Sequence, residues 1–134
     1  MIVVDASVLA NAFTDDGPVG DTGRAELARD VHWAGPEHVI VETFSALRGR
    51  HLGGKISKQR ARDALEALSS AAIELVSTKP LLPRMWQLRD NCSGYDAAYV
   101  AAAEAHGCLL VTADVRLTRT DGLRCEVRLG VPVG

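Results

Sequence analysis

Two aspartates follow short apolar runs that are typical of buried strands. Asp5 comes directly after Ile2–Val4, and Asp114 follows the run that ends in Val111 and Thr112. Ligand sites of parallel α/β sheets lie beyond the carboxyl ends of the strands. If these two strands are neighbours, Asp5 and Asp114 meet at one edge of the sheet.

Two further acids are placed to join them. Asp96 stands in the first turn of a predicted helix, and Glu42 lies in the middle of another, beside Val41 and Phe44. An unpaired carboxylate next to such apolar residues is costly to bury. Two carboxylates about 5 Å apart repel by roughly 3 kcal/mol at an effective dielectric near 20, so four together keep protons or bind cations. Mg²⁺ or Mn²⁺ would meet that need, and such ions orient a phosphodiester and activate water to cleave it.

Each acid also has a purely structural interpretation. Asp5 and Asp114 could cap the helices that follow them, and Asp96 could close a capping box with the serine three residues before it. Glu42 could reach solvent at the helix rim or pair with Arg48. Taken one residue at a time, the sequence leaves these interpretations open.

Three other kinds of site are disfavoured. The 3 cysteines and 4 histidines show no CxxC, HExxH or finger-like spacing, which argues against zinc. Signalling receivers need paired acids after the first strand and a lysine after the last, but Asp5 stands alone and no strand-end lysine follows. Haloacid-dehalogenase-like phosphatases need Asp-x-Asp, and here the third position is Ser7.

The acids must be positioned by strands that alternate with helices. Apolar and β-branched runs predict the strands, and apolar spacing with capping residues predicts the helices. Strands are expected at 2–4, 31–33, 73–76, 108–112 and 126–129. Helices are expected at 6–13, 22–30, 36–50, after the cap Ser57, at 81–90, 95–106, and as a short helix or turn at 114–120. This alternation predicts one α/β domain over residues 1–134, with a parallel central sheet flanked by helices on both faces.

Composition suits one domain and says little about function. The 134 residues are 47% hydrophobic with a net charge of −2, so no overall basic field indicates a polyanionic partner. The odd number of scattered cysteines suits a reducing compartment, and the N-terminal apolar run is too short for a signal peptide. No segment approaches the roughly 20 apolar residues that span a membrane. We therefore expect a cytoplasmic protein without a membrane partner.

Four segments together resemble the PIN-domain nucleases, and most closely the VapC toxins of bacterial VapBC toxin–antitoxin modules. They are Ile2–Ser7, Pro36–Glu42, Tyr95–Ala101 and Leu110–Asp114, whose order and spacing suit that family over essentially the whole chain. The resemblance implies a single PIN domain that cleaves RNA endonucleolytically with Mg²⁺ or Mn²⁺ and leaves a 5′-phosphate. It also implies a homodimer that is silenced when a cognate VapB-type antitoxin occludes the acidic site.

The resemblance also assigns roles to individual residues. Asp5 and Asp96 align with acids that bind the metal directly, and Glu42 and Asp114 align with acids that complete the cluster, on the metal or through water. Thr112 matches a hydroxyl position beside the last acid, which it is expected to orient. All four acids are intact, which disfavours the alternative of a catalytically silent PIN scaffold that binds only protein or RNA.

A local excess of basic residues follows the predicted Glu42 helix. The stretch from position 48 to 62 has no acid and carries His51 together with Arg48, Arg50, Lys55, Lys58, Arg60 and Arg62. These side chains could hold RNA phosphates beside the acids. Charged runs more often form a solvated helix face, and that is the alternative.

Overall fold

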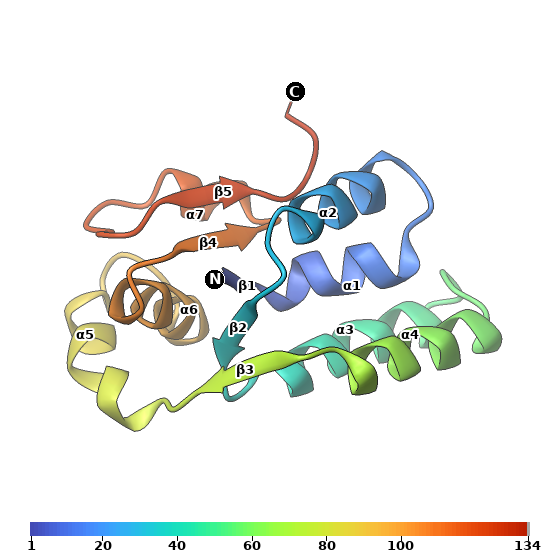
Figure 1. Ribbon diagram of the computed structural model, residues 1–134, viewed down its shortest axis with the longest axis horizontal. Coiled ribbons are helices and arrows are strands. Elements are labelled where there is room, and N and C mark those ends of the chain that lie inside the picture. The colour runs from blue at the N-terminus through green and yellow to red at the C-terminus, as the bar shows by residue number, and fades with distance from the viewer. Residues whose placement is uncertain (134) are drawn as a thin grey trace.

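A five-stranded parallel sheet positions the acids (Figure 1). The computed structural model describes residues 1–133, and its strands are β1 (Ile2–Val4), β2 (Trp33–Pro36), β3 (Ile73–Val76), β4 (Leu109–Thr112) and β5 (Val127–Leu129). Their order is β3-β2-β1-β4-β5, and every neighbouring pair is parallel. In the central strand β1, Val4 pairs with Val111 of β4 and Val3 pairs with Ala34 of β2. The predicted parallel sheet is confirmed, and the strands that precede Asp5 and Asp114 are neighbours.

Helices flank this sheet on both faces, as predicted (Figure 1). They are α1 (Ala6–Thr14), α2 (Pro18–Ala28), α3 (Val39–Leu52), α4 (Lys58–Ser70), α5 (Leu82–Gln87), α6 (Gly94–Ala105) and α7 (Val115–Thr118). Helix α1 contacts β4 and packs against α2, α3 and α4, whereas α6 packs across β1, β2 and β4. Helix α5 packs on α6, and α7 packs beside β5.

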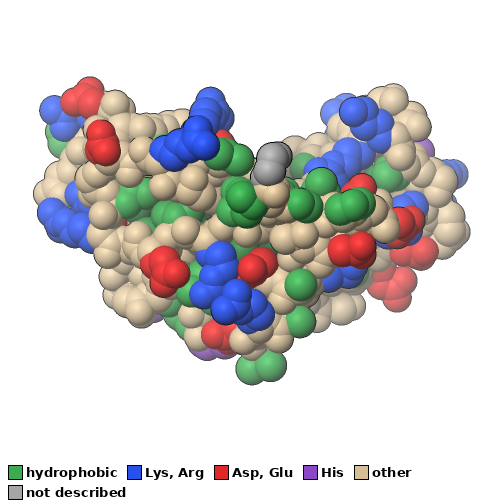
Figure 2. All heavy atoms as spheres, turned by 90° about the horizontal axis from the view of Figure 1, so that it is seen from above, with side chains coloured by type: hydrophobic (Ala, Val, Ile, Leu, Met, Phe, Trp, Pro, Cys, Tyr) green, Lys and Arg blue, Asp and Glu red, His purple; other side chains and the backbone are tan. Residues whose placement is uncertain are grey.

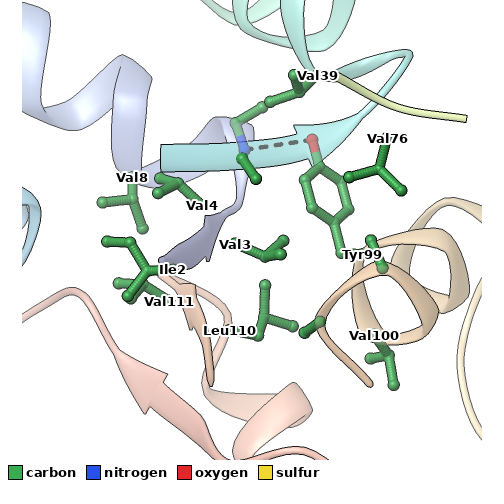
Figure 3. Close-up of a cluster of buried hydrophobic side chains, with 14 of the residues drawn as sticks. Ile2, Val3, Val4, Val8, Val39, Val76, Tyr99, Val100, Leu110 and Val111 are labelled. Carbon is green, nitrogen blue, oxygen red and sulfur yellow. Dashed lines mark hydrogen bonds between the residues drawn. The ribbon is translucent and has the colours of Figure 1, made fainter. Parts of the chain in front are cut away.

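The hydrophobic core lies on both sides of β1, because successive side chains of a strand point to opposite faces. Val3 and Leu110 lie beside Tyr99 of α6, whereas Val4 lies toward Val8 of α1 (Figure 3). All five side chains are at most 1% exposed, and complete burial of an aliphatic side chain contributes about 1.5 to 3 kcal/mol. A second cluster holds α1 against α3 and α4, and it consists of Ala10, Leu47, Ala64 and Leu68.

The second strand and the helix after it both begin later than predicted. The predicted strand start, Val31, is 98% exposed, and β2 begins two residues further on. Pro36 was expected to start a helix, but it pairs with Val76 as the last residue of β2. Its fixed φ suits the end of a strand as well as the start of a helix, and pairing with β3 decides between them. Helix α3 therefore begins at Val39.

The second helix begins earlier than predicted, at Pro18 rather than Thr22. The Asp15 carboxylate accepts hydrogen bonds from the backbone N–H of Gly17 at 3.2 Å and of Gly20 at 2.7 Å. A Cβ at Gly20 would collide with the Asp15 carbonyl group, so this approach requires glycine. Residues expected to lie between two helices thus form the start of α2, because proline at the first position needs no acceptor and Asp15 satisfies the free N–H groups.

The other boundaries differ less from those expected. Helix α5 ends at Gln87 rather than near residue 90, and a 3₁₀ turn, η1 (Lys79–Leu81), precedes it. Ser57 caps α4 as predicted, since its hydroxyl oxygen accepts a hydrogen bond from the backbone N–H of Arg60 at 3.0 Å. Among residues 1–133, no helix has the length and apolar character needed to cross a membrane.

Candidate active site

The carboxyl ends of the three central strands lead to three of the four acids. Asp5 follows β1 directly, Asp114 follows β4 after one intervening residue, and Glu42 lies in the first turn of α3, beyond β2. Asp96 lies in the first turn of α6, the helix that packs across the same three strands. The expectation that Glu42 lies in the middle of its helix is wrong, because α3 begins only at Val39.

Asp5 is held by hydrogen bonds from two segments of the chain. It is 8% exposed and is the N-cap of α1, where its Oδ1 accepts from the backbone N–H of Ser7 at 3.3 Å. Its Oδ2 accepts from the Thr112 hydroxyl at 2.7 Å, and the Thr112 oxygen in turn accepts from the Asp114 backbone N–H at 3.1 Å. The Ser7 hydroxyl oxygen accepts from the Ala113 backbone N–H at 3.2 Å. These bonds fasten the start of α1 to the segment that follows β4.

Glu42 is the most perturbed of the four acids. Burial, followed by the charges of Asp5 and Asp96, raises the pKa of Glu42 to about 7. Its Oε2 accepts from the Tyr99 hydroxyl at 3.5 Å. Its Oε1 lies 3.0 Å from His38 Nε2, yet within residues 1–133 neither of these buried atoms has a partner in hydrogen-bond geometry. The neighbour of Glu42 is thus His38 rather than Arg48, the partner considered from sequence.

Asp96 and Asp114 differ in how their charges are compensated. Burial, followed by the Asp5 charge, raises the pKa of Asp96. Its backbone N–H donates to Ser93 Oγ at 3.1 Å, so Ser93 is the N-cap of α6. Asp114 is the N-cap of α7, and hydrogen bonding from the Arg116 side chain lowers its pKa. The capping role therefore holds for Asp5 and Asp114, and it does not prevent their carboxylates from facing the other acids.

The chemistry of this donor set suits a hard divalent cation. Asp5 raises the pKa of both Glu42 and Asp96, which means that the charges interact across the site. Within residues 1–133 the buried Glu42 Oε1 accepts no hydrogen bond in good geometry, although His38 Nε2 lies 3.0 Å away, and a cation would satisfy it. Among residues 1–133, however, no three His, Cys, Asp or Glu side chains are already arranged to hold a metal ion. The acids are thus neighbours without forming a preassembled coordination sphere.

Comparison with known proteins is decisive for the family. A model described as the PIN domain matches residues 2–123. The chain is 37% identical to ribonuclease VapC9 of Mycobacterium tuberculosis over 127 residues, which cover 95% of this chain and 96% of that protein. The chain belongs to the VapC ribonucleases of the PIN-domain family.

Solved structures of lower sequence identity share the fold of this PIN domain. VapC20 of Mycobacterium tuberculosis, a toxin that cleaves the sarcin–ricin loop, matches with a TM-score of 0.70 at 19% identity over 92% of this chain and 96% of that one. VapBC2 of Rickettsia felis, bound to a DNA fragment from its promoter, matches with a TM-score of 0.68 at 16% identity over 95% and 98% of the two chains.

Two aromatic residues of the PIN domain border Glu42 and were not singled out as site residues from sequence. The rings of His38 and Tyr99 pack edge to face with centroids 5.2 Å apart. The Tyr99 hydroxyl oxygen accepts from the Ala6 backbone N–H at 3.3 Å (Figure 3). Burial lowers the pKa of His38 and raises that of Tyr99, so it favours the neutral form of each. Their spacing could have indicated them, since His38 precedes Glu42 by four residues and Tyr99 follows Asp96 by three.

The basic stretch of this PIN domain divides into two groups. Arg50 donates to Thr14 Oγ1 and Asn11 Oδ1, both at 2.7 Å, and Arg60 pairs with Asp16 at 2.7 Å. These two arginines fasten α3 and α4 to the end of α1. The other four side chains are exposed, and they belong to Arg48, Lys55, Lys58 and Arg62.

This stretch begins six residues after Glu42 and leads away from it along α3. It occupies the end of α3 and the start of α4, and a helix rises about 1.5 Å per residue, so Leu52 is about 15 Å from Glu42 along α3. On the face shown in Figure 2, lysine and arginine side chains are scattered among acidic and hydrophobic ones and form no single continuous patch.

Proposed function

We propose that this VapC-family chain is the toxin of a type II toxin–antitoxin system, a cytoplasmic endoribonuclease whose four acids act with Mg²⁺ or Mn²⁺. Membership of the VapC ribonucleases supports RNA cleavage. The observation that supports the site assignment is that burial, followed by the nearby Asp5 charge, raises the pKa of both Glu42 and Asp96 at the carboxyl edge of the central strands. The alternative of a silent scaffold does not account for a carboxylate whose pKa is raised to about 7 by burial and by the charges of Asp5 and Asp96.

The metal, when bound, would polarise the scissile phosphate and lower the pKa of an attacking water. Asp5 and Asp96 would hold it, with Glu42 and Asp114 completing the acidic lining. The remaining tasks fall to the chain's own hydrogen bonds. The Thr112 hydroxyl fixes one oxygen of Asp5 and leaves the other toward the helix start.

In the metal-free protein Glu42, with a pKa of about 7, is partly protonated at neutral pH, and a cation held by Asp5 and Asp96 would favour its charged form. The Tyr99 hydroxyl donates to Glu42 Oε2 at 3.5 Å, which fixes the position of the carboxylate while its other oxygen stays available. Neutral His38 beside that oxygen adds no competing positive charge.

We propose that the exposed basic residues Arg48, Lys55, Lys58 and Arg62 bind RNA phosphates at a distance from the acids. Their exposure and the absence of acids from this stretch support that role. Arg50 and Arg60, predicted from sequence to share it, are engaged in intramolecular bonds, and we assign them to holding α3 and α4 in place.

We further propose a homodimer and a cognate VapB-type antitoxin that occludes the acidic site. Helix α3 bears large exposed hydrophobic side chains, Val41 at 66%, Phe44 at 46% and Leu52 at 65%. Val41 and Phe44, three residues apart, share one face of α3, and contiguous exposed apolar side chains are typical of protein interfaces. Light scattering of the purified chain, alone and mixed with the antitoxin, measures both assemblies. A chain that stays monomeric and does not bind the antitoxin would refute the homodimer and the antitoxin proposals, and the nuclease proposal would be unaffected.

Replacing the acids tests the catalytic assignment. Asp5→Asn and Asp96→Asn should each abolish cleavage of total cellular RNA while circular dichroism and the melting temperature stay close to those of the parent. Asp63→Asn, at an exposed acid of α4, is the matched control and should cleave normally. EDTA should silence the parent, and Mg²⁺ or Mn²⁺ should restore it. Parental cleavage rates in both acid variants, or activity that survives chelation, would overturn the assignment.

A further inference from the structure

Arg116 is the one exposed arginine that contacts the acidic site directly, among residues 1–133. Its guanidinium forms two hydrogen bonds to the Asp114 carboxylate, Nε to Oδ1 at 3.2 Å and Nη2 to Oδ2 at 3.0 Å. The Arg116 side chain is 89% exposed, whereas that of Asp114 is 27% exposed. One end of this ion pair is thus anchored in the site and the other lies in solvent.

A small polar pocket lies between this ion pair and Asp96. Its volume is about 230 Å³, and its lining residues include Asp96, Asp114 and Arg116. Asn91 and Ser93 of the opposite wall also line it. The pocket therefore opens from the acidic site itself, and it has room for the base or sugar of one nucleotide.

The polar groups of the opposite wall are held in place and can still bind a ligand. Asn91 Nδ2 donates to the Asp121 carbonyl at 2.7 Å, and within residues 1–133 no group donates to its Oδ1. Gly122 allows this approach, because it has φ +84° and a Cβ there would lie 2.7 Å from Asn91 Nδ2. The Ser93 oxygen accepts from the Asp96 backbone N–H and its hydroxyl also bonds to the Asp96 side chain, which leaves one lone pair of the oxygen for a ligand. Donors and acceptors in fixed positions are what recognition of a base or ribose requires.

The Arg116–Asp114 pair is suited to exchange partners. An ion pair with so exposed a partner contributes little to stability, so breaking it costs little. The guanidinium fork that fits a carboxylate also fits a phosphate in the same two-bond geometry. An incoming phosphate can therefore replace the Asp114 carboxylate as the partner of Arg116.

We propose that Arg116 and the pocket beside it form the subsite for the nucleotide next to the scissile bond, with Arg116 binding that nucleotide's phosphate and Asn91 and Ser93 contacting its base or ribose. The inference rests on the proposed ribonuclease function, which it deepens by naming a positioning residue. Its structural alternative is that Arg116 only screens Asp114 and stabilises the first turn of α7.

RNA binding separates these two roles. All variants carry Asp5→Asn, so that the probe is not cut, and binding of a fluorescein-labelled single-stranded RNA of mixed sequence is followed by anisotropy in magnesium buffer over a range of salt. Arg116→Ala should weaken binding by about tenfold and lower the slope of log K against log salt by about 1. Arg119→Ala, an exposed arginine of the same segment outside the pocket, is the matched control and should change neither.

A double variant shows whether Arg116 merely screens its neighbour. If Arg116 contacts phosphate, adding Asp114→Asn to Arg116→Ala leaves binding weak. Full rescue by Asp114→Asn, or equal behaviour of Arg116→Ala and Arg119→Ala, would overturn the inference. Asn91→Ala should weaken binding without changing the salt slope, and unchanged affinity would remove the pocket from the subsite.

The proposed function is tested separately by the protein with Asp5 intact. If that protein cleaves RNA and Arg116→Ala behaves as Arg119→Ala does, the subsite is refuted and the nuclease stands. If it does not cleave, the nuclease proposal fails, whatever the binding experiment shows.

Discussion

Replacing Glu42 by glutamine should stabilise the metal-free protein at pH 8 and should have almost no effect at pH 4. Glutamine keeps the size and the hydrogen-bonding capacity of the side chain and removes only its negative charge. Beside neutral His38, the glutamine amide can donate to Nε2, from which Glu42 Oε1 lies 3.0 Å away. The change therefore removes the charge of Glu42 while it keeps the packing of the side chain.

The magnitude follows from the perturbed pKa. A rise from 4.5 to about 7 corresponds to about 3 kcal/mol, because a tenfold change in proton affinity equals about 1.4 kcal/mol. The Glu42 side chain is 33% exposed, so solvent screening reduces this value, and we expect about 1 to 2 kcal/mol. The folded protein holds the proton more tightly than the unfolded chain, so its stability falls as pH rises from 4.5 to about 7. Above that range the whole penalty is present, and below it the penalty vanishes.

Urea unfolding in EDTA at pH 4, 6 and 8 measures this effect. The free-energy difference between Glu42→Gln and the parent should grow with pH and level off near pH 8. Glu66→Gln, at an exposed glutamate of α4, is the matched control and should show no such trend. Mg²⁺ at pH 8 should stabilise the parent more than Glu42→Gln, because binding to the folded state alone adds to stability.

A stability difference that does not change with pH would refute this reasoning. It would mean that Glu42 is well solvated or already neutralised, and that the acids do not crowd one another. Destabilisation by Glu42→Gln at pH 8 would be still stronger evidence against it, since the carboxylate would then be making a net favourable interaction.

Two further predictions concern groups that hold the site and its scaffold. Thr112→Val removes the hydroxyl that donates to Asp5 at 2.7 Å and accepts from the Asp114 N–H at 3.1 Å. It should therefore cost about 1 to 3 kcal/mol in urea unfolding and lower the RNA cleavage rate, whereas Thr112→Ser should retain most of the stability and the activity. A fully active valine variant would contradict the positioning role. Glu104→Gln weakens the ion pair with Arg84, whose Nε lies 2.6 Å from Oε1, and should cost about 2 to 3 kcal/mol near pH 7. Burial raises the pKa of Glu104, but hydrogen bonding from Arg84 outweighs it and lowers this pKa. The difference in unfolding free energy between the parent and Glu104→Gln should therefore disappear as pH falls below 4.5 and the Glu104 carboxylate takes up a proton. An undiminished difference at pH 3 would contradict this account.

The sequence predicted the parts of the fold that depend on local apolar pattern. The runs at 2–4 and 109–112 are strongly apolar and were recognised as strands, and the acids after them were placed at one edge by the rule for parallel sheets. The boundaries around Pro18 and Pro36 could not be predicted in the same way. Proline at the first position of a helix and proline at the end of a strand have the same φ, and only tertiary pairing decides between them.

The sequence predicts the four acids of the candidate site, and their catalytic role stays a prediction. Their order and spacing, together with the family resemblance, bring them together, whereas their surroundings follow no such pattern. His38 and Tyr99 escaped notice because an aromatic residue in an apolar helix usually belongs to the core. The intramolecular roles of Arg50 and Arg60 depend on residues at and just after the end of α1. Arg50 bonds to Thr14, 36 residues away in the sequence, and Arg60 bonds to Asp16, 44 residues away. A local sequence pattern cannot predict hydrogen-bond partners that lie so far apart along the chain.

The four acids divide by the donors that the fold gives them, and this division indicates where a cation is needed. Asp114 has Arg116, which lowers its pKa, and Asp5 has the Thr112 hydroxyl and the Ser7 N–H. Glu42 has one long hydrogen bond from Tyr99, and burial and like charge raise its pKa, as they do for Asp96. His38 Nε2 lies 3.0 Å from Glu42 Oε1, but within residues 1–133 neither atom has a partner in hydrogen-bond geometry. The burial and like charge that raise the pKa of Glu42 and Asp96 cost free energy in the metal-free protein, and a divalent ion would reduce that cost on binding, so metal affinity and loss of stability share a physical cause.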